Sequence, residues 1–281
     1  MTPVRVVITA AGILLSVVQV AAAADAQPRR ILIEYIAPKN PAHQSLHEHV
    51  KEERVLEKLQ ELFSPFKLPI DLTFKTVGCD GRSNAWYHRP SITLCYEYLH
   101  DIRENVPKET TPAGTTPADA LAGQLFYVVA HEFGHAVFDL LQLPSFGNSE
   151  NIADQFSTYM MLHFGKDEAR RLISGAAYSY KSVLQSPIAF VPLQAYSDIH
   201  GQPGQRLFNL LCLAYGADPK GFADVVEHKY LPTERAADCG REYSQVDFAF
   251  QRLISPHVDQ ELAKRTMQKD WLSEVQPRRS P

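Results

Sequence analysis

The chain has 281 residues, of which 45% are hydrophobic and 21% are charged. This composition is ordinary for a soluble globular protein and excludes a disordered or fibrous chain. The formal net charge is −4 and the sequence has no basic stripe, so a nucleic-acid partner is not indicated. A chain of this length can bury a hydrophobic core without added crosslinks.

Residues 1–24 predict a signal peptide. Arg5 is followed by the apolar stretch VVITAAGILLSVVQVAAAA, which ends in small residues. A positive start, an apolar core and an A-x-A site are typical of export signals, with cleavage here after Ala24 or Ala26. The alternative is an uncleaved anchor, because residues 6–24 are almost long enough to span a bilayer. The alanine run favours cleavage, so we expect an exported protein, periplasmic or secreted, with no stable membrane insertion afterwards.

Four cysteines lie in the exported part, at Cys79, Cys95, Cys212 and Cys239. An even number of cysteines in an oxidising compartment indicates two disulfides. Three pairings are possible, and proximity in the sequence favours Cys79–Cys95 and Cys212–Cys239. No pair has the C-x-x-C spacing of a zinc knuckle or a redox site, so a structural role is favoured.

The first part of the mature chain, residues 25–100, predicts a small mixed sheet with one helix. Strands are expected at 29–37, 69–77 and 91–98, where apolar and β-branched residues gather or alternate. Residues 44–63 carry apolar side chains at roughly helical spacing. The segment ITLCYEY within the last strand could be either a core strand or an edge strand that pairs with an extended substrate.

Helices dominate after a Pro- and Thr-rich loop at 103–119. Asp119 is a candidate N-cap for a long apolar helix at 120–142, which Pro144 and Gly147 end. Asn148 or Ser149 is expected to cap the next helix, at 149–164. Further helices are predicted at 167–184, 205–215, 219–228 and 232–254, a loop at 187–204, and a flexible tail at 271–281.

Strands followed by helices are the order of an α+β fold. No repeated β-α-β units are visible, so a doubly wound parallel sheet is not indicated. We therefore expect a single domain over residues 25–270, in which residues 119–255 form the helical part.

The long helix contains the segment His131-Glu132-Phe133-Gly134-His135. Residues four apart face the same side of a helix, so two imidazoles at this spacing can bind one metal ion. Glu132 is displaced from the ligand positions and is placed to take a proton from water as a general base. A purely structural zinc would use four protein ligands and no base, so the pattern favours a catalytic Zn²⁺ site over that alternative or a chance match.

A catalytic zinc needs a third protein ligand. A histidine six residues after the motif is excluded, because position 141 is Leu141. Glu150, at the start of the next helix, is the better candidate, although it could instead be an acidic residue favoured by the helix dipole. Asp154 lies one turn later and could accept the second ring N–H of a ligand histidine, or bind the metal directly.

HEFGH followed by SENIAD resembles the glutamate-zincin arrangement of thermolysin-like peptidases. In that arrangement a glutamate on the helix after H-E-x-x-H completes the metal site, and an aspartate four residues later supports the first histidine. The chain is also similar to an uncharacterised bacterial family of predicted metallopeptidases, through CDGRSNAWY, ITLCYEY, VVAHEFGHAVFDLL, DIHGQPGQRLFNLLCLAYG and LPTERAADC. The resemblance implies a zincin-like catalytic region and two disulfides, but no particular substrate.

A peptidase also needs a hydrogen-bond donor for the oxyanion of its tetrahedral intermediate. His200 and Tyr196, in the polar segment YSDIH, are candidates, and Tyr87 and Tyr96 are others. Such polar loops often carry function, whereas a lone histidine is more often structural.

The sequence therefore predicts a zinc-dependent metallopeptidase that acts on peptides or proteins through a metal-activated water. One alternative is an exported zinc amidase that cleaves a cell-wall or other non-peptide amide. The other is a metal-stabilised binding protein without turnover, although binding alone would not require Glu132.

Overall fold

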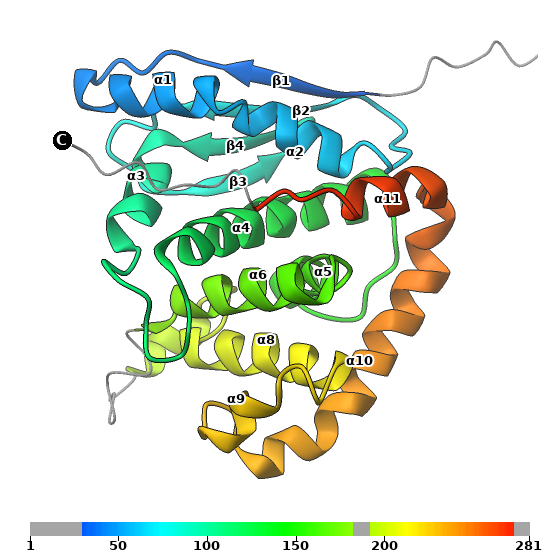
Figure 1. Cartoon of the computed structure of the whole chain (residues 1–281). Coiled ribbons are helices and arrows are strands. Elements are labelled where there is room, and N and C mark those ends of the chain that lie inside the picture. Colours follow the sequence, from blue (N-terminus) through cyan, green and yellow to red (C-terminus); the bar gives the residue numbers. More distant parts are fainter. Residues whose placement is uncertain (1–29, 182–191, 273–281) are drawn as a thin grey trace, which may run out of the picture.

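The computed structural model describes residues 30–181 and 192–272, which form an α+β structure with a small sheet and layers of helices (Figure 1). The expected signal peptide and the last residues of the expected tail lie outside the described residues. At the start of that tail, Leu272 is buried and the indole N–H of Trp271 donates to the carbonyl of Thr266.

The sheet has the strand order β1-β2-β4-β3, with β1 at Ile31–Tyr35, β2 at Leu72–Val77, β3 at Ala85–His88 and β4 at Ser91–Cys95. β1, β2 and β4 are parallel to one another, and β3 pairs with β4 in the antiparallel sense. The mixed sheet is confirmed. The edge-strand interpretation of ITLCYEY is wrong, because β4 lies between β2 and β3, and the edge is formed by β3, which the sequence did not reveal.

Helices α1 (Gln44–Glu52) and α2 (Val55–Phe63) lie on one face of the sheet (Figure 1). They replace the single helix predicted at 44–63, because Arg54 adopts a left-handed backbone conformation with φ of 52°. A short 3₁₀ turn, η1 (Pro41–His43), precedes α1. On the inner side of α2, Leu56, Leu59 and Phe63 enter the core.

Helix α3 (Tyr96–Asn105) begins directly after β4, so the predicted strand ends three residues earlier than expected. The first turn of α3 holds the loop between β2 and β3, because the carboxylate of Glu97 accepts hydrogen bonds from the backbone N–H groups of Cys79 and Gly81. These hydrogen bonds outweigh the strand preference of the aromatic residues in YEY.

Helix α4 (Pro117–Leu140) packs on the same face of the sheet as α2, because the ring of Phe74 in β2 lies against both Phe63 of α2 and Phe133 of α4. It lies between the sheet and helices α5 and α6 (Figure 1). The sequence predicts Asp119 as the N-cap of α4, and this prediction is wrong, because Thr116 is the N-cap. Asp119 is instead the third helical residue, and the two side chains form a capping box. The helix is buried on nearly all sides, which explains its apolar composition.

Helices α5 (Ser149–Leu162), α6 (Lys166–Tyr178) and α8 (Pro203–Ala217) lie beyond α4 (Figure 1). The side chain of Asn148 caps α5, as one of the two expected options. The stretch before α8 contains the 3₁₀ turn η2 (Leu193–Ser197). No helix within residues 30–181 and 192–272 is long and apolar enough to cross a membrane.

The chain then forms α9 (Ala223–Glu227) and the long helix α10 (Thr233–Leu253), which runs along the side of the helical layers (Figure 1). The 3₁₀ turn η3 (Ser255–His257) leads into α11 (Gln260–Met267), which the sequence did not reveal. Near η3 the chain returns to the segment after α2, where the N–H of Lys67 donates to the carbonyl of His257 over 2.7 Å.

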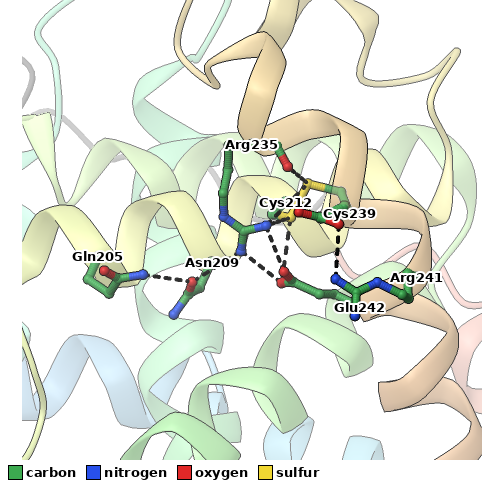
Figure 2. The surroundings of a disulfide bond; sticks show 8 residues. Gln205, Asn209, Cys212, Arg235, Cys239, Arg241 and Glu242 are labelled. Atoms are coloured by element: carbon green, nitrogen blue, oxygen red, sulfur yellow. Dashed lines mark hydrogen bonds and ion pairs between the residues drawn. A yellow bond between two sulfur atoms is a disulfide. The ribbon is translucent and has the colours of Figure 1, made fainter.

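Both predicted disulfides are confirmed. Cys79–Cys95 joins the loop after β2 to the end of β4, and Cys212–Cys239 joins α8 to α10. Beside the second disulfide, Arg235 forms a double hydrogen bond with Glu242, which lies seven residues later on α10, as Figure 2 shows. Two disulfides fit an extracellular protein.

Candidate metal centre

The HEFGH segment of α4 is oriented by the residue in its middle. The ring of Phe133 packs on Phe63 at 4.3 Å and on Phe66 at 4.9 Å, between centroids, on the core side of the helix. Gly134 lies close to α5, where an added Cβ would be 3.3 Å from the Cα of Ala153. The two histidines therefore emerge from α4 beside the first turns of α5.

Three side chains converge in this space. Nε2 of His131 lies 3.2 Å from Nε2 of His135 and 3.1 Å from Oε2 of Glu150, and the last two atoms are 3.4 Å apart. Asn148 fixes the start of α5 through a 2.8 Å bond from the Glu150 N–H, which places Glu150 in its first turn. In the part of the chain that the structure describes, the other group of this kind contains two disulfide cysteines and cannot offer thiolates.

Asp154 lies behind His131 and fixes its ring. The Nδ1 atom of His131 is 2.8 Å from the Asp154 carboxylate, which leaves Nε2 directed at His135 and Glu150. This is the orientation expected of an aspartate that supports a ligand histidine, rather than of a direct ligand.

Arg206 of α8 holds the other side of Asp154, and the sequence did not single it out. Its Nε and one terminal nitrogen donate to the two carboxylate oxygens over 2.8 and 2.7 Å. Burial raises the pKa of Asp154, but the hydrogen bonds from His131 and Arg206 outweigh burial and lower it to about 2. A buried carboxylate requires a charged or hydrogen-bonding partner. An aspartate predicted to be buried therefore indicates a cationic side chain elsewhere in the sequence, although not which one.

Glu132 faces the edge strand of the sheet. Its Oε2 accepts a 2.8 Å hydrogen bond from the backbone N–H of Tyr87 in β3. Burial raises the pKa of Glu132 to about 7, against the lowering effect of His131 and of this hydrogen bond. A carboxyl group with a pKa near neutrality can both accept and return a proton.

The four oxyanion candidates have different positions. His200 reaches the centre, with Nε2 3.3 Å from Oε2 of Glu150 and Nδ1 3.0 Å from Asp198, and its side chain is 49% exposed. Tyr96 lies in a separate buried cluster, where its hydroxyl is 2.7 Å from Nδ1 of His47. Tyr196 is 61% exposed to solvent.

Tyr87 is turned away from the convergent donors. Its hydroxyl donates to Asp139 over 2.6 Å, and Arg89 forms a double hydrogen bond with the same carboxylate. Asp139, four residues after His135, thus connects β3 to the end of α4 and is not bonded to a ligand histidine.

A cavity of about 510 Å³ opens at this centre. Its wall includes Glu132, His135, Glu150 and His200, together with residues of β3. The cavity thus brings the edge strand together with two of the three convergent side chains, those of His135 and Glu150.

Residues 35–254 match a family model described as "Putative metallopeptidase". The chain belongs to this family. No curated protein and no solved structure matches the chain. The matched region contains the whole of the His131, His135 and Glu150 group, so membership of the metallopeptidase family and a three-residue candidate metal site agree.

Proposed function

We propose that the protein is an exported zinc metallopeptidase of the glutamate-zincin type, with a zincin-like catalytic region. The observation that carries the proposal is the convergence of two ring nitrogens and one carboxylate oxygen beside Glu132. The separations of these donors, 3.1 to 3.4 Å, suit a tetrahedral zinc, whose ligands at about 2.0 Å from the metal lie about 3.3 Å apart. Two imidazoles and one carboxylate are also a donor set that zinc prefers.

When bound, zinc would supply a Lewis acid that makes water a stronger nucleophile and the substrate carbonyl a stronger electrophile. Glu132 takes the proton from the attacking water and then gives it to the leaving amine. The Tyr87 N–H holds one Glu132 oxygen, which leaves the other oxygen free for this transfer. Asp154 and Arg206 hold His131 in the tautomer that offers Nε2 to the metal.

His200 is the group that we assign to the oxyanion. Its ring lies beside the donors, and Asp198 orients it through Nδ1. In the doubly protonated ring, Nδ1 donates to Asp198 and Nε2 can donate to the developing negative charge. The peptide would add to the sheet along β3, because this edge strand borders the cavity and leads to Glu132.

The test is cleavage of a mixed peptide library by the purified, zinc-loaded protein. We expect turnover that a chelator abolishes and that added zinc restores. Glu132→Gln should retain zinc, measured by elemental analysis, and lose at least about a hundredfold in kcat, since the proton acceptor is gone. Glu104→Gln, an exposed acid on α3, is the matched control and should cleave as the unaltered protein does.

Two results would contradict the proposal. Zinc bound without turnover on peptides or other amides would identify a binding protein. Cleavage restricted to non-peptide amides would identify an amidase.

A further inference from the structure

A second cavity, of about 260 Å³, adjoins the first, and its wall does not include Tyr87. Both cavities are lined by Glu132, His200 and the residues at the start of β3, so they meet at the proposed general base. His131 forms part of the wall of the smaller cavity and His135 part of the wall of the larger one. A substrate that spans the two cavities therefore has its scissile bond at the junction.

The wall of the smaller cavity is rich in hydroxyl groups. Tyr98 of α3, Tyr127 of α4 and Tyr180 after α6 contribute phenols from three separate parts of the chain. Tyr180 donates to the hydroxyl of Tyr127 over 3.4 Å, a long hydrogen bond that a better acceptor can replace. Burial is the main cause that raises the pKa of Tyr98, to about 12, and that of Tyr180, so both remain O–H donors at neutral pH.

The charges around this cavity favour an acceptor over a cation. Arg206 also lines it, and two of its nitrogens are bound to Asp154. A lysine or arginine side chain would meet this guanidinium. Asp154 is already bound to His131 and Arg206, and one oxygen of Glu132 accepts the N–H of Tyr87. An aliphatic side chain would displace water from the phenols and from Arg206 without replacing its hydrogen bonds, which is costly in a buried site.

We propose that this cavity selects the substrate residue next to the scissile bond, and that the selected side chain carries an amide or carboxylate oxygen. Asparagine, glutamine, aspartate and glutamate share this chemistry. The inference rests on the proposed peptidase function and adds to it the class of substrate. Tyr98 and Tyr180 are then specificity-determining residues, since removing their hydroxyls changes the choice of substrate and not the chemistry of cleavage.

The test uses the full zinc-loaded protein and peptides that vary at the two positions flanking the cut. Product sequencing should show one flanking position at which Gln, Asn, Glu or Asp exceeds Leu by about tenfold or more in kcat/KM. Comparison of Gln with Glu peptides distinguishes the amide from the carboxylate. In Tyr98→Phe and Tyr180→Phe the ratio of kcat/KM for the acceptor peptide to kcat/KM for the Leu peptide should fall about threefold to tenfold.

A matched control and a second readout accompany this test. Tyr243→Phe, on α10 and outside the cavity, should leave the preference unchanged. Calorimetric titration of Glu132→Gln with uncleaved Gln and Leu peptides measures the same preference as a ratio of Kd values, without turnover.

The outcomes separate the inference from the function on which it rests. Metal-dependent cleavage with no preference for acceptor side chains, or with a preference that survives both Tyr→Phe changes, overturns the inference and leaves the peptidase. A protein that cleaves no peptide and binds Gln and Leu peptides equally overturns both.

Discussion

Asp154 connects α4 to α8, because it accepts hydrogen bonds from both His131 and Arg206. It is buried, and both of its partners depend on its negative charge. Its role therefore differs from that of Glu150, which offers an oxygen to the same space as the histidine nitrogens.

Asp154→Asn should weaken zinc binding about 10- to 100-fold while leaving all three proposed ligands in place. The neutral amide no longer stabilises the His131 orientation that presents Nε2, and Arg206 loses its counter-charge. Competition with a chromophoric chelator measures the zinc Kd. Asp167→Asn, an exposed acid in the first turn of α6, is the control, and an equal Kd in both variants would remove Asp154 from the metal centre.

Glu97 holds the disulfide loop between β2 and β3 by accepting backbone N–H bonds from Cys79 and Gly81. Burial raises the pKa of this carboxyl, but these N–H groups outweigh burial and lower it below 4.5. Because the folded-state pKa is the lower one, the stabilisation is complete above the ordinary pKa. It is lost as the pH falls from 4.5 through the folded-state value.

Glu97→Gln should accordingly lower the free energy of unfolding by about 1 kcal/mol at neutral pH, and by progressively less below pH 4.5. Urea titrations at a series of pH values measure the difference. His43, whose Nε2 lies 4.0 Å from a carboxylate oxygen of Glu97, is left unchanged in both proteins. The exposed residue Glu109 supplies the control change, and a difference between Glu97→Gln and the unaltered protein that grows on acidification would refute the argument.

The candidate metal group was predictable because the spacing of its residues along two adjacent helices fixes their geometry. His131 and His135 are one helical turn apart, and so are Glu150 and Asp154. Arg206 lacked such a signal, since it lies 52 residues from Asp154. The Tyr87 contribution is a backbone N–H, which no residue type reveals.

Among the elements, α4 and α6 approach each other most closely at two glycines. A Cβ on Gly123 would lie 2.4 Å from the carbonyl oxygen of Leu172, and one on Gly175 would lie 1.8 Å from that of Asp119. Both neighbours are backbone atoms, which cannot move without separating the helices. This contact holds α6 directly against α4.

Gly123→Ala should therefore destabilise the protein by about 1–3 kcal/mol, although alanine favours helix formation. Gly240, inside α10, provides the matched control, because an added Cβ there has no atom within 4 Å. Gly240→Ala should stabilise by about 0.5–1 kcal/mol through helix propensity alone. Urea unfolding of both variants measures the two changes, and a shift in the same direction would show that close packing at Gly123 is unimportant.

The elements were predicted well where a long hydrophobic pattern identified them and poorly where a few residues decided. The pattern at 120–142 gave α4 with its N-terminus three residues too late, because the Thr116–Asp119 capping box lies in a segment that resembles a loop. The helical spacing of 44–63 concealed the break at Arg54. β3 has four residues, which is too short for an alternating pattern to be distinguished from a loop.

At the scale of the molecule, segments remote in sequence meet where no local pattern predicts it. Phe66, just after α2, pairs with Val258, just before α11. The N–H of Asp259 donates to the carbonyl of Pro65 in the same place. These contacts join the segment before α11 to the segment after α2. The order of most elements could therefore be predicted from the sequence, but the contacts between its distant parts could not.

The proposed metal would join α4 to α5, and so its removal should be felt by the whole fold. Zinc that binds the native state alone stabilises it by about 2.7 kcal/mol when the free metal exceeds Kd a hundredfold. For a protein of this size, each kcal/mol shifts Tm by roughly 2–4 °C. Chelation should lower Tm by the corresponding amount.

Calorimetry of the unaltered protein, Glu150→Gln and Glu132→Gln distinguishes the proposed metal ligand from the proposed general base. Glu150→Gln should lose most of the zinc-dependent rise in Tm, since a neutral amide replaces a charged oxygen 3.1 Å from Nε2 of His131. Glu132→Gln should keep the rise, because its oxygen is bound to the Tyr87 N–H and does not belong to the convergent group. If Glu132→Gln abolished the rise and Glu150→Gln did not, the two glutamates would have exchanged roles, and the third ligand would have to be sought on α4 rather than α5.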